Sequence, residues 1–405
     1  MGARFLVASY FAGTLPADPN FEENEDLILL QEALLEVYSD EEPIDFGDSQ
    51  IDVGASGTAL RFVTAVCASS VGADYIITGT DRLMHRPMAP LISLLRKAGA
   101  GVQTLGEGDT GPYRVTGLNL EGGEFSIRGD ISSQFISALM LVAPSWKNGM
   151  KLWFDTPLVS MPYVEMTARI MERFGIEVNL SEIKVEVKAG KYKEPKDFYV
   201  EPDWSAASFF YEACALGVED IDIEGLVPHS ESLQGDSITE EIFGKLGVST
   251  SYNKDGARLH ADLSLPEILE QDFKNMPDLV LPVSVACLCN DVRFRFSGIA
   301  NLRLKESDRV ESLIKESLKL GYVVKADEDS LFWDGEKAAY EKDVLIDPHD
   351  DHRVAMSFAM VALKTGGIRI SNPEVVRKSY IDFWNQLPQL GLNCREEDNV
   401  MIITR

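Results

Sequence analysis

Residues 161–188 read MPYVEMTARIMERFGIEVNLSEIKVEVK, and this stretch decides the fold. Apolar residues recur there at three- and four-residue spacing, as in Val164, Ala168 and Met171, which is typical of an amphipathic helix. Gly175 follows, and a glycine commonly ends a helix in the left-handed conformation. Apolar and polar residues then alternate on both sides of a short polar turn, which predicts two strands. The stretch therefore predicts a helix followed by a β-hairpin.

The same order of helix, glycine and strand occurs in four other segments. Together with Gly175, the glycines that end these segments are spaced 70 to 76 residues apart, and one repeating unit explains so regular a spacing. The four segments are RPMAPLISLLRKAGAGV, GDSITEEIFGKLGVS, ESDRVESLIKESLKLGYVV and YIDFWNQLPQLGLN, and their glycines are Gly99, Gly247, Gly321 and Gly391.

A second series of segments is apolar nearly all round, which predicts buried helices. Their start positions are spaced 72 to 77 residues apart, so two independent patterns share one period. These segments are GTALRFVTAVCAS, SSQFISALMLVAP, SAASFFYEACALG, PDLVLPVSVACL and DHRVAMSFAMVAL, and their marker positions are Ser56, Ser133, Ser205, Asp278 and Asp351.

The N-terminal region resembles a sixth copy with a shorter spacing. ARFLVASYFAG (residues 3–13) predicts a buried helix, and NEDLILLQEALLEV (24–37) predicts the amphipathic helix that follows it. Each copy has the order βαβαββ, and 405 residues exceed what one hydrophobic core usually supports. The sequence therefore predicts an α/β (α+β) protein of two domains, each built from three βαβαββ units.

The charge and composition exclude several classes of protein. The chain has 38 Lys and Arg against 65 Asp and Glu, a net charge of −27, which repels nucleic acid and anionic membranes. Its five cysteines form no CxxC pair, which favours a reducing compartment. No secretion signal and no apolar run of membrane-spanning length is present in the sequence. We expect a soluble, cytoplasmic protein.

Polar and basic residues collect where the predicted helices start. Helix N-termini present unpaired N–H groups and the positive end of the helix dipole, so several converging N-termini form an anion site. Four such residues precede amphipathic helices or lie in their first turn, and four open buried helices. The first group is Arg86, Ser160, the Lys305–Arg309 segment and Lys378; the second is Ser132, Ser133, His352 and Arg353.

Two charged segments allow more than one interpretation. NLRLKESDRV (301–310) places Lys305, Glu306 and Arg309 on one side of a predicted first helical turn, either as a solvated, ion-paired face or as part of an anion site. HDDHRVAM (349–356) contains either metal ligands or a cap for a buried helix. No further Cys or His lies at ligand spacing, so we do not expect a metal.

Asp278 of MPDLVLP (276–282) precedes a helix that is otherwise apolar. It is either an N-cap, for which aspartate is common, or a functional carboxylate. The sequence pattern alone leaves both interpretations open.

In chain order, these motifs resemble those of the 5-enolpyruvylshikimate-3-phosphate synthase family over nearly the whole sequence. KESDR and DHR are the most specific of them. The motifs are GASGTALRF, TGTDRLMHRPMAPLISLLRKAGA, ISSQFISALMLVAP, LVSMPYVEMT, EPDWSAASFF, LQGD, MPDL, NLRLKESDRV, DDHRVAMSFAMVAL and RKSYIDFW.

The resemblance implies a fold and a reaction. The fold is an inside-out α/β barrel in each of two domains, here 1–201 and 202–405, with the active site in the cleft between them. The reaction transfers the enolpyruvyl group of phosphoenolpyruvate to the 5-hydroxyl of shikimate 3-phosphate and releases phosphate, as a step of aromatic amino acid biosynthesis. No cofactor and no metal takes part, and we expect a monomer whose partners are these two small substrates.

The resemblance also implies a role for each matching residue. Asp278 accepts the proton of the attacking hydroxyl, and Glu306 exchanges a proton with the methylene carbon. Gln134 contacts both substrates, and Arg309 and Arg353 form a fork for the phosphoenolpyruvate carboxylate. The shikimate 3-phosphate residues are Arg4, Ser132, Ser133, Gln134, Ser160, Tyr163, Asp278, Asn301 and Lys305. The phosphoenolpyruvate residues are Gly57, Arg86, Gln134, Arg309, His352, Arg353 and Lys378.

The sequence departs from the family pattern at three places. Ala55 stands where the family usually has Asn, and Met161 replaces a frequent Lys. The family also opens with a Lys-Ser segment shortly before the arginine that matches Arg4. We expect that segment, with a strand and a cation, to fall upstream of Met1 and its absence to reduce activity.

Two other functions compete with this interpretation. One is the related transfer of the enolpyruvyl group to UDP-N-acetylglucosamine, which usually relies on a loop cysteine that this sequence lacks at the corresponding place. The other is a non-catalytic homologue that binds ligand without turnover. Phosphate release from phosphoenolpyruvate with each acceptor distinguishes the three.

Overall fold

The computed structural model describes residues 1–16, 24–39, 49–196, 199–262, 264–340 and 342–405. The chain forms two compact units, Met1–Val200 and Glu201–Arg405, and each is described here by itself. The sequence placed the boundary one residue later, between 201 and 202. No helix among these residues is long and apolar enough to cross a membrane.

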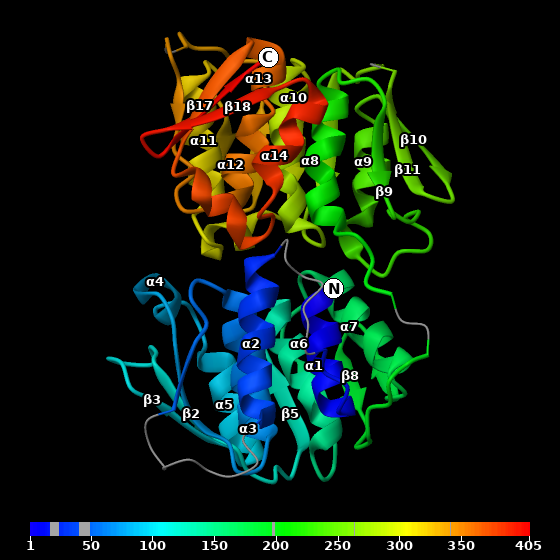
Figure 1. Cartoon of the computed structure of the whole chain (residues 1–405), viewed down its shortest axis with the longest axis vertical. Helices are drawn as coiled ribbons and strands as arrows, with labels where there is room; N and C mark the ends of the chain where they lie inside the picture. The colour runs from blue at the N-terminus through cyan, green and yellow to red at the C-terminus, as the bar shows by residue number, and fades with distance from the viewer. Residues whose placement is uncertain (17–23, 40–48, 197–198, 263, 341) are drawn as a thin grey trace. The chain divides into compact units, whose positions relative to one another are not determined.

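The repeat from β5 to β8 shows how the sequence forms one complete βαβαββ element of the first unit (Figure 1). Strand β5 (Gly123–Ile127) leads through α6 (Ser133–Val142) to β6 (Met150–Phe154), which pairs with β5 in parallel. Helix α7 (Met161–Arg173) leads to the hairpin of β7 (Val178–Leu180) and β8 (Lys184–Val187). Strand β8 pairs antiparallel with β6, so the sheet order is β5-β6-β8-β7.

Three more sheets have the same strand order and the same pairing directions, so the predicted βαβαββ repeat is confirmed. The first contains β1 (Gln50–Asp52), β2 (Asp74–Thr78), β4 (Tyr113–Thr116) and β3 (Gly101–Thr104). The second contains β12 (Ile268–Asp272), β13 (Arg293–Ser297), β15 (Ser330–Trp333) and β14 (Lys325–Ala326). The third contains β16 (Leu345–Ile346), β17 (Gly367–Ser371), β19 (Val400–Thr404) and β18 (Asn393–Glu397).

The remaining two repeats are incomplete in the described chain. The sheet of β9 (Ile221–Glu224), β11 (Gly256–Ala261) and β10 (Val248–Asn253) has three strands, and β9 lies at its edge. The N-terminal copy contains both predicted helices, α1 (Gly2–Ala12) and α2 (Glu25–Ser39). Residues 40–48, which follow α2, lie outside the described residues.

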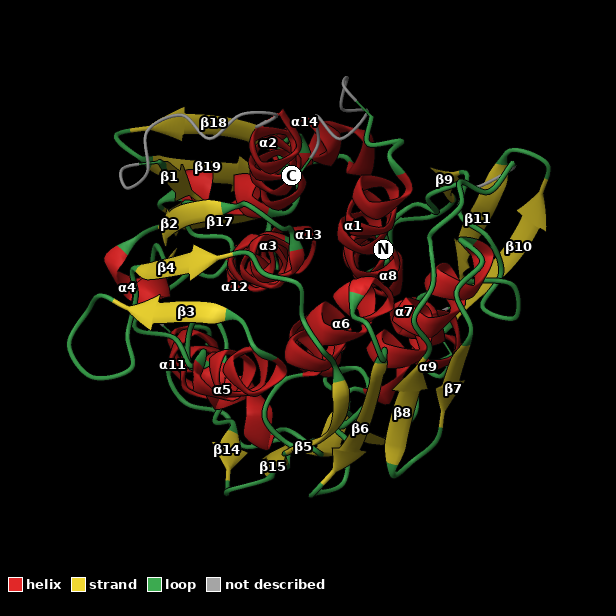
Figure 2. Ribbon diagram, turned by 90° about the horizontal axis from the view of Figure 1, so that it is seen from below, coloured by secondary structure: helices red, strands yellow, loops and turns green. Residues whose placement is uncertain are grey.

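In each unit the buried helices lie inside and the sheets lie at the periphery (Figure 2). This explains why these helices are apolar nearly all round, because every face packs against protein. The buried helices are α1, α3 (Gly57–Ser69), α6, α8 (Trp204–Ala215), α10 (Val280–Cys289) and α12 (His352–Ala359).

The amphipathic helices end as the sequence predicts. All five glycines of the first series adopt positive φ, for example 82° at Gly175 after α7. Such a conformation favours glycine because a Cβ would be strained. The helices of this series are α5 (Ala89–Ala98), α7, α9 (Thr239–Gly244) and α11 (Arg309–Lys319).

The fifth predicted amphipathic helix, which was expected before Gly391 in the segment 380–393, is wrong as a continuous helix. The structure has a short α14 (Phe383–Gln386) and then a 3₁₀ turn at Leu387–Leu390. Pro388 lies in this second turn and has no N–H for an α-helical bond to the preceding turn. Two further short helices are α4 (Asp81–Met84) and α13 (Ala362–Thr365).

Candidate active site

In the first unit, the predicted serines lie at the N-termini of two helices. Ser132 caps α6 by accepting a hydrogen bond from the Gln134 N–H at 3.3 Å, and Ser133 is the first helical residue. The Gln134 side chain donates to the Thr58 hydroxyl at 3.2 Å. Thr58 lies in the first turn of α3, so the N-termini of α6 and α3 lie side by side.

Ser160 begins α7 in an unusual conformation. Its φ of 57° and ψ of 40° are left-handed, and its hydroxyl does not cap the helix. Ser, Thr and Asp at this position normally cap the helix with their side chains. Non-glycine residues in the left-handed region are uncommon and cluster at functional sites. The hydroxyl of Ser160 is therefore spared from capping and is available to a ligand.

Arg4 is a buried cation of helix α1. Its guanidinium donates to the Thr167 hydroxyl at 2.6 Å and the Ser137 hydroxyl at 3.3 Å, but no carboxylate pairs with it in the described part of the chain. Burial lowers the pKa of Arg4 to about 10. Thr167 in turn donates to the Tyr163 carbonyl at 2.8 Å, which links Arg4 to the first turn of α7. The guanidinium also lies over the ring of Phe62, and a buried cation whose described hydrogen bonds go to hydroxyls is suited to bind an anion.

Gly57 lies under two guanidinium groups at the N-terminus of α3. A Cβ built on Gly57 would lie 2.5 Å from Arg61 Nη1 and 2.7 Å from Arg86 Nη1. Arg61 is buried and donates to the Gly57 carbonyl at 2.7 Å. Arg86 is thus placed beside the buried backbone of Gly57 at the helix N-terminus. Together they form a positive site of the kind that binds phosphate.

In the second unit, Asp278 binds three cations. Its Oδ1 accepts from Arg309 Nη1 at 2.7 Å and from Lys305 Nζ at 3.4 Å, and its Oδ2 accepts from Arg353 Nη2 at 3.2 Å. The Asp278 side chain is 17% exposed, so water screens these contacts only partly. Asp278 lies in a 3₁₀ turn, Pro277–Leu279, that leads into α10.

Arg309 connects three carboxylates, those of Asp278, Glu306 and Asp351. Its Nη2 lies 2.9 Å from Glu306 Oε2, and its Nε lies 2.8 Å from Asp351 Oδ2. Glu306 also accepts from Lys378 Nζ at 3.1 Å. The Arg309 side chain is 2% exposed and that of Asp351 is fully buried. The result is a connected network in which both predicted acid/base residues, Asp278 and Glu306, contact cations.

The network shifts the ionisation of its members. Burial would raise the pKa of Asp278, but Arg353, Lys305 and Arg309 together lower it well below its usual value. Burial likewise opposes ionisation of Asp351, and Arg309 lowers its pKa. Burial would lower the pKa of Arg309, but Asp351, Glu306 and Asp278 raise it. Asp278, Asp351 and Arg309 are therefore ionised at neutral pH.

His352 and Asn301 each contribute a side-chain atom without a partner among the described residues. His352 is buried, its Nδ1 has no hydrogen bond, and burial lowers its pKa to about 3. The imidazole is therefore neutral at pH 7. Asn301 lies in a 3₁₀ turn (Ala300–Leu304), and its Oδ1 is also buried without a partner. Both are buried polar atoms whose hydrogen-bonding capacity is unused among the described residues.

Two expectations from the sequence are corrected here. Lys305 and Glu306 do not lie in a first helical turn, because α11 begins only at Arg309, where Asp308 caps the Glu311 N–H at 3.0 Å. The Glu306 to Arg309 pair forms nevertheless. Asp278 is not an N-cap, because it lies inside the 3₁₀ turn Pro277–Leu279, whose N-cap is Met276, and the N-cap of α10 is Leu279. Its interpretation as a simple helix cap is therefore wrong.

Two further residues belong to these sites although the sequence did not indicate them. Asp351 was interpreted only as a cap for α12, and it does accept from the Arg353 N–H at 3.0 Å. It also binds Arg309, a contact across 42 residues that no local pattern signals. Arg61 lies in an apolar helix, where a charge is costly unless it is paired. A charged residue in an otherwise apolar helix is the sequence signal that could have identified Arg61.

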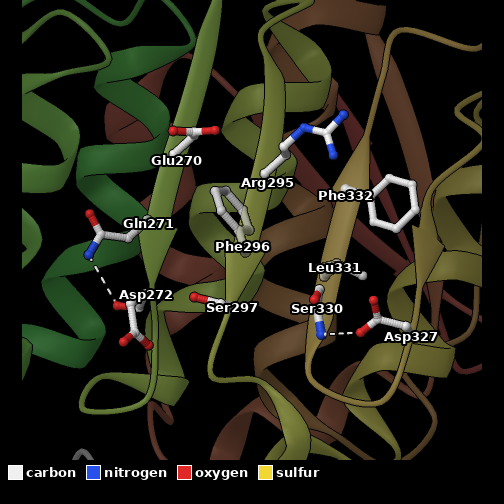
Figure 3. Close-up of a pocket in the computed structure, with 10 residues that line it drawn as sticks. All are labelled: Glu270, Gln271, Asp272, Arg295, Phe296, Ser297, Asp327, Ser330, Leu331 and Phe332. Carbon is white, nitrogen blue, oxygen red and sulfur yellow. Dashed lines mark hydrogen bonds between the residues drawn. The ribbon is translucent and has the colours of Figure 1, made fainter.

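A separate hollow of about 520 Å³ lies on the sheet of β12, β13 and β15 (Figure 3). It contains none of the candidate residues. Arg295, one of its charged side chains, is paired with Asp334 at 2.9 Å and lies over the ring of Phe332. We assign it no role. No group of three His, Cys, Asp or Glu side chains suited to hold a metal occurs among the residues that the structure describes.

Comparisons with known proteins identify the family of this chain. The family model of EPSP synthase (3-phosphoshikimate 1-carboxyvinyltransferase) matches residues 20–387. A Bacteroides fragilis protein named 3-phosphoshikimate 1-carboxyvinyltransferase is 40% identical over 352 residues, which cover 86% of this chain and 85% of the relative. A protein of the same name from Idiomarina loihiensis is 33% identical over 347 residues, 84% of this chain and 80% of that one.

A solved structure shows the same fold. EPSP synthase from Acinetobacter baumannii superimposes with a TM-score of 0.70 at 23% identity, over 99% of this chain and 94% of that chain. The family model and the relatives identify the family, and the solved neighbour shows the fold. The chain belongs to the EPSP synthase family.

Proposed function

We propose that this protein transfers the enolpyruvyl group of phosphoenolpyruvate to the 5-hydroxyl of shikimate 3-phosphate and releases phosphate. The observation that carries the proposal is the Asp278 carboxylate in contact with Lys305, Arg309 and Arg353. A carboxylate held by cations that a substrate anion can also bind is suited to proton transfer beside that anion. The relatives' shared name supplies the identity of the substrates.

The first unit is proposed to bind shikimate 3-phosphate through helix N-termini. Ser132, Ser133 and the uncapped Ser160 provide hydroxyl and N–H donors for its phosphate. Arg4, buried without a carboxylate partner in the described chain, completes the charge. Gln134, Tyr163, Asn301 and Lys305 are proposed to contact the ring and its substituents.

Phosphoenolpyruvate is proposed to use the remaining cations. Gly57, Arg86 and Lys378 bind its phosphate, and Arg309 with Arg353 forms a fork for its carboxylate. Arginine is suited to this because two of its N–H groups match the two oxygens of a carboxylate. His352, neutral through burial, donates or accepts a single hydrogen bond, and Gln134 is proposed as a further contact of this substrate.

The free protein already occupies these cations with its own carboxylates. Arg309 and Arg353 hold Asp278, and Lys378 holds Glu306. When the substrate carboxylate takes over the two arginines, Asp278 loses the charges that lower its pKa. It then becomes a stronger base at the moment when the substrate is bound. The same exchange at Lys378 weakens the hold on Glu306.

The proton transfers then follow. Asp278 accepts the 5-hydroxyl proton as that oxygen attacks C2 of phosphoenolpyruvate, and Glu306 protonates the C3 methylene to give a tetrahedral intermediate. Glu306 next removes a proton from C3 as the C2–O bond to phosphate breaks. Glu306 is thereby protonated again, phosphate leaves with the proton that Asp278 accepted, and the enol ether remains, so protons and atoms balance without a cofactor.

We further propose that the enzyme acts as a monomer in the cytoplasm. All five cysteines are free thiols, which suits a reducing compartment. Each unit has its own buried core, for example the cluster around Trp204, Phe243 and Phe294 in the second unit.

Phosphate release tests the proposed reaction. The protein is incubated with phosphoenolpyruvate and either shikimate 3-phosphate or UDP-N-acetylglucosamine. Release with shikimate 3-phosphate alone supports the proposal. Release with the UDP sugar instead identifies the related transferase, and binding of both shikimate-pathway substrates without release identifies a non-catalytic homologue.

A further inference from the structure

The turn before helix α12 has an unusual backbone. His349 and Asp350 are consecutive non-glycine residues with φ of 53° and 59°. Side chains rarely adopt this left-handed conformation, and two in a row require strong local contacts. The next residue, Asp351, begins α12, and its N–H donates to the Pro348 carbonyl at 2.9 Å. Arg353 follows in the first turn of α12.

A buried carboxylate on helix α11 supports this turn. The Glu316 side chain is 1% exposed, and its Oε1 lies 2.9 Å from His349 Nε2. Its Oε2 accepts from Lys319 Nζ at 2.6 Å and from the Asp347 N–H at 3.0 Å. Asp347 in turn accepts from the His349 N–H at 2.8 Å. Glu316 thus binds both ends of the 347–349 segment.

Helix α11 contacts the segment at a second point. Arg309 and Glu316 are seven residues apart, which is about two turns and places them on one face of α11. Arg309 binds Asp351, and Glu316 binds Asp347 and His349. Two contacts on one helix face therefore hold the segment that carries Asp351 and Arg353.

We propose that Glu316, acting with His349, is a positioning residue for the phosphoenolpyruvate carboxylate site. It holds the 347–351 turn so that Arg353 and Arg309 present their guanidinium groups to one carboxylate. Glu316 does not touch the substrate. The proposal deepens the proposed function and rests on it for the identity of the ligand.

The contacts distinguish this role from simple stabilisation of α11. Lys319 lies on the same helix and would satisfy only one oxygen of Glu316. The contacts of Glu316 with His349 and with the Asp347 N–H connect α11 to the 347–351 turn. Loss of the Glu316 charge should therefore loosen the start of α12 more than α11 itself.

The test compares Glu316→Gln with Glu311→Gln. Glu311 is on the same helix but is half-exposed and pairs with Lys315 at 3.3 Å. We expect Glu316→Gln to raise the KM for phosphoenolpyruvate by about 10-fold, since a misplacement of about 1 Å costs up to 10²-fold. The KM for shikimate 3-phosphate should change less than about twofold on the same reasoning. Glu311→Gln should change neither.

A double-mutant cycle shows whether Glu316 acts through Arg353. In an Arg353→Ala background, adding Glu316→Gln should raise the KM for phosphoenolpyruvate by less than about twofold further, because the effects of coupled residues are not additive. Independent, additive losses would overturn the proposal. So would an equal rise in both KM values.

Hydrogen exchange separates this inference from the proposed function. Amides of residues 351–354 should exchange faster in Glu316→Gln than in Glu311→Gln, and this readout needs no turnover. If the wild-type protein releases no phosphate, the proposed function fails and exchange alone decides the positioning role. Unchanged exchange overturns it. Should Glu316→Gln not fold, His349→Ala replaces a partly exposed partner and must give the same pattern.

Discussion

Glu212 offers a quantitative test of the fold of the second unit. This residue of α8 is fully buried, and neither of its carboxyl oxygens has a hydrogen-bond partner among the described residues. Burial raises the pKa of Glu212 well above its usual value. The side chain is therefore held protonated in the folded protein, while the unfolded chain ionises it at its ordinary pKa.

The sign of the pH effect follows from proton linkage. Above the unfolded pKa of about 4.3, the folded state binds one proton more than the unfolded state. The free energy of unfolding therefore falls as pH rises, by about 1.4 kcal/mol per pH unit for one group. The loss continues until the pH reaches the raised folded pKa. Below pH 4, Glu212 is protonated in both the folded and the unfolded state, so this loss of stability is absent.

Replacing Glu212 separates two contributions. Glu212→Leu removes a buried polar group without partners, which costs about 1–3 kcal/mol, so the variant should be more stable by about that amount below pH 4 and by more at pH 7. Each kcal/mol corresponds to a rise in Tm of roughly 2–4 °C for a unit of this size. Glu212→Gln keeps a buried polar group but cannot ionise. It should lose the pH dependence, so it gains little stability below pH 4 but gains about 1.4 kcal/mol relative to wild type for each pH unit above the unfolded pKa.

The assay is urea unfolding of the three proteins at intervals from pH 5 to pH 9. Trp204 of α8, which is fully buried, reports unfolding of this unit by fluorescence. The difference between wild type and Glu212→Gln isolates the single group from all other titrations. The reasoning fails if wild type and Glu212→Gln have parallel pH profiles, or if Glu212→Leu is less stable than wild type.

Three predictions concern the site. Asp278→Asn should lower kcat by about 10²–10⁴-fold, because the base is lost. Equilibrium dialysis should show that the variant still binds shikimate 3-phosphate. Unchanged turnover would contradict this role. Arg353→Lys should raise the KM for phosphoenolpyruvate by at least about 10-fold, because lysine cannot form the fork; a steady-state titration with an unchanged KM would sink the assignment. Gly57→Ala should weaken phosphoenolpyruvate binding, because the added Cβ would lie 2.5 Å and 2.7 Å from two arginine nitrogens; calorimetry showing equal affinity would refute the phosphate site.

The repeat was predictable because its signals are local. Gly175 ends a helix through its own conformation, and the alternation after it defines a hairpin within a few residues. Recurrence of these patterns then placed Asp278 and Arg353 at equivalent ends of buried helices. The 3₁₀ turn at Leu387–Leu390 was missed because the apolar spacing outweighed Pro388 in the sequence pattern.

The ion network could be predicted only in part. Glu306 and Arg309 are close in sequence, so their pair was foreseeable, but helix α11 starts later than expected because Asp308 is the better cap. Asp351 looks like a cap and is one. Its bond to Arg309 depends on how α11 packs against α12, and no pattern within either segment carries that information.

The three-stranded sheet leaves β9 at an edge in the described chain. Its sequence, IDIE, is short and carries Asp222 and Glu224, and such charges discourage an edge from pairing with another molecule. We therefore expect these carboxylates to oppose self-association through β9 rather than to take part in the catalysed reaction. Replacing both with valine should leave the folded core intact and yet drive self-association through β9. The same edge could accept a complementary designed strand, which makes it an attachment point for linking this enzyme to another protein.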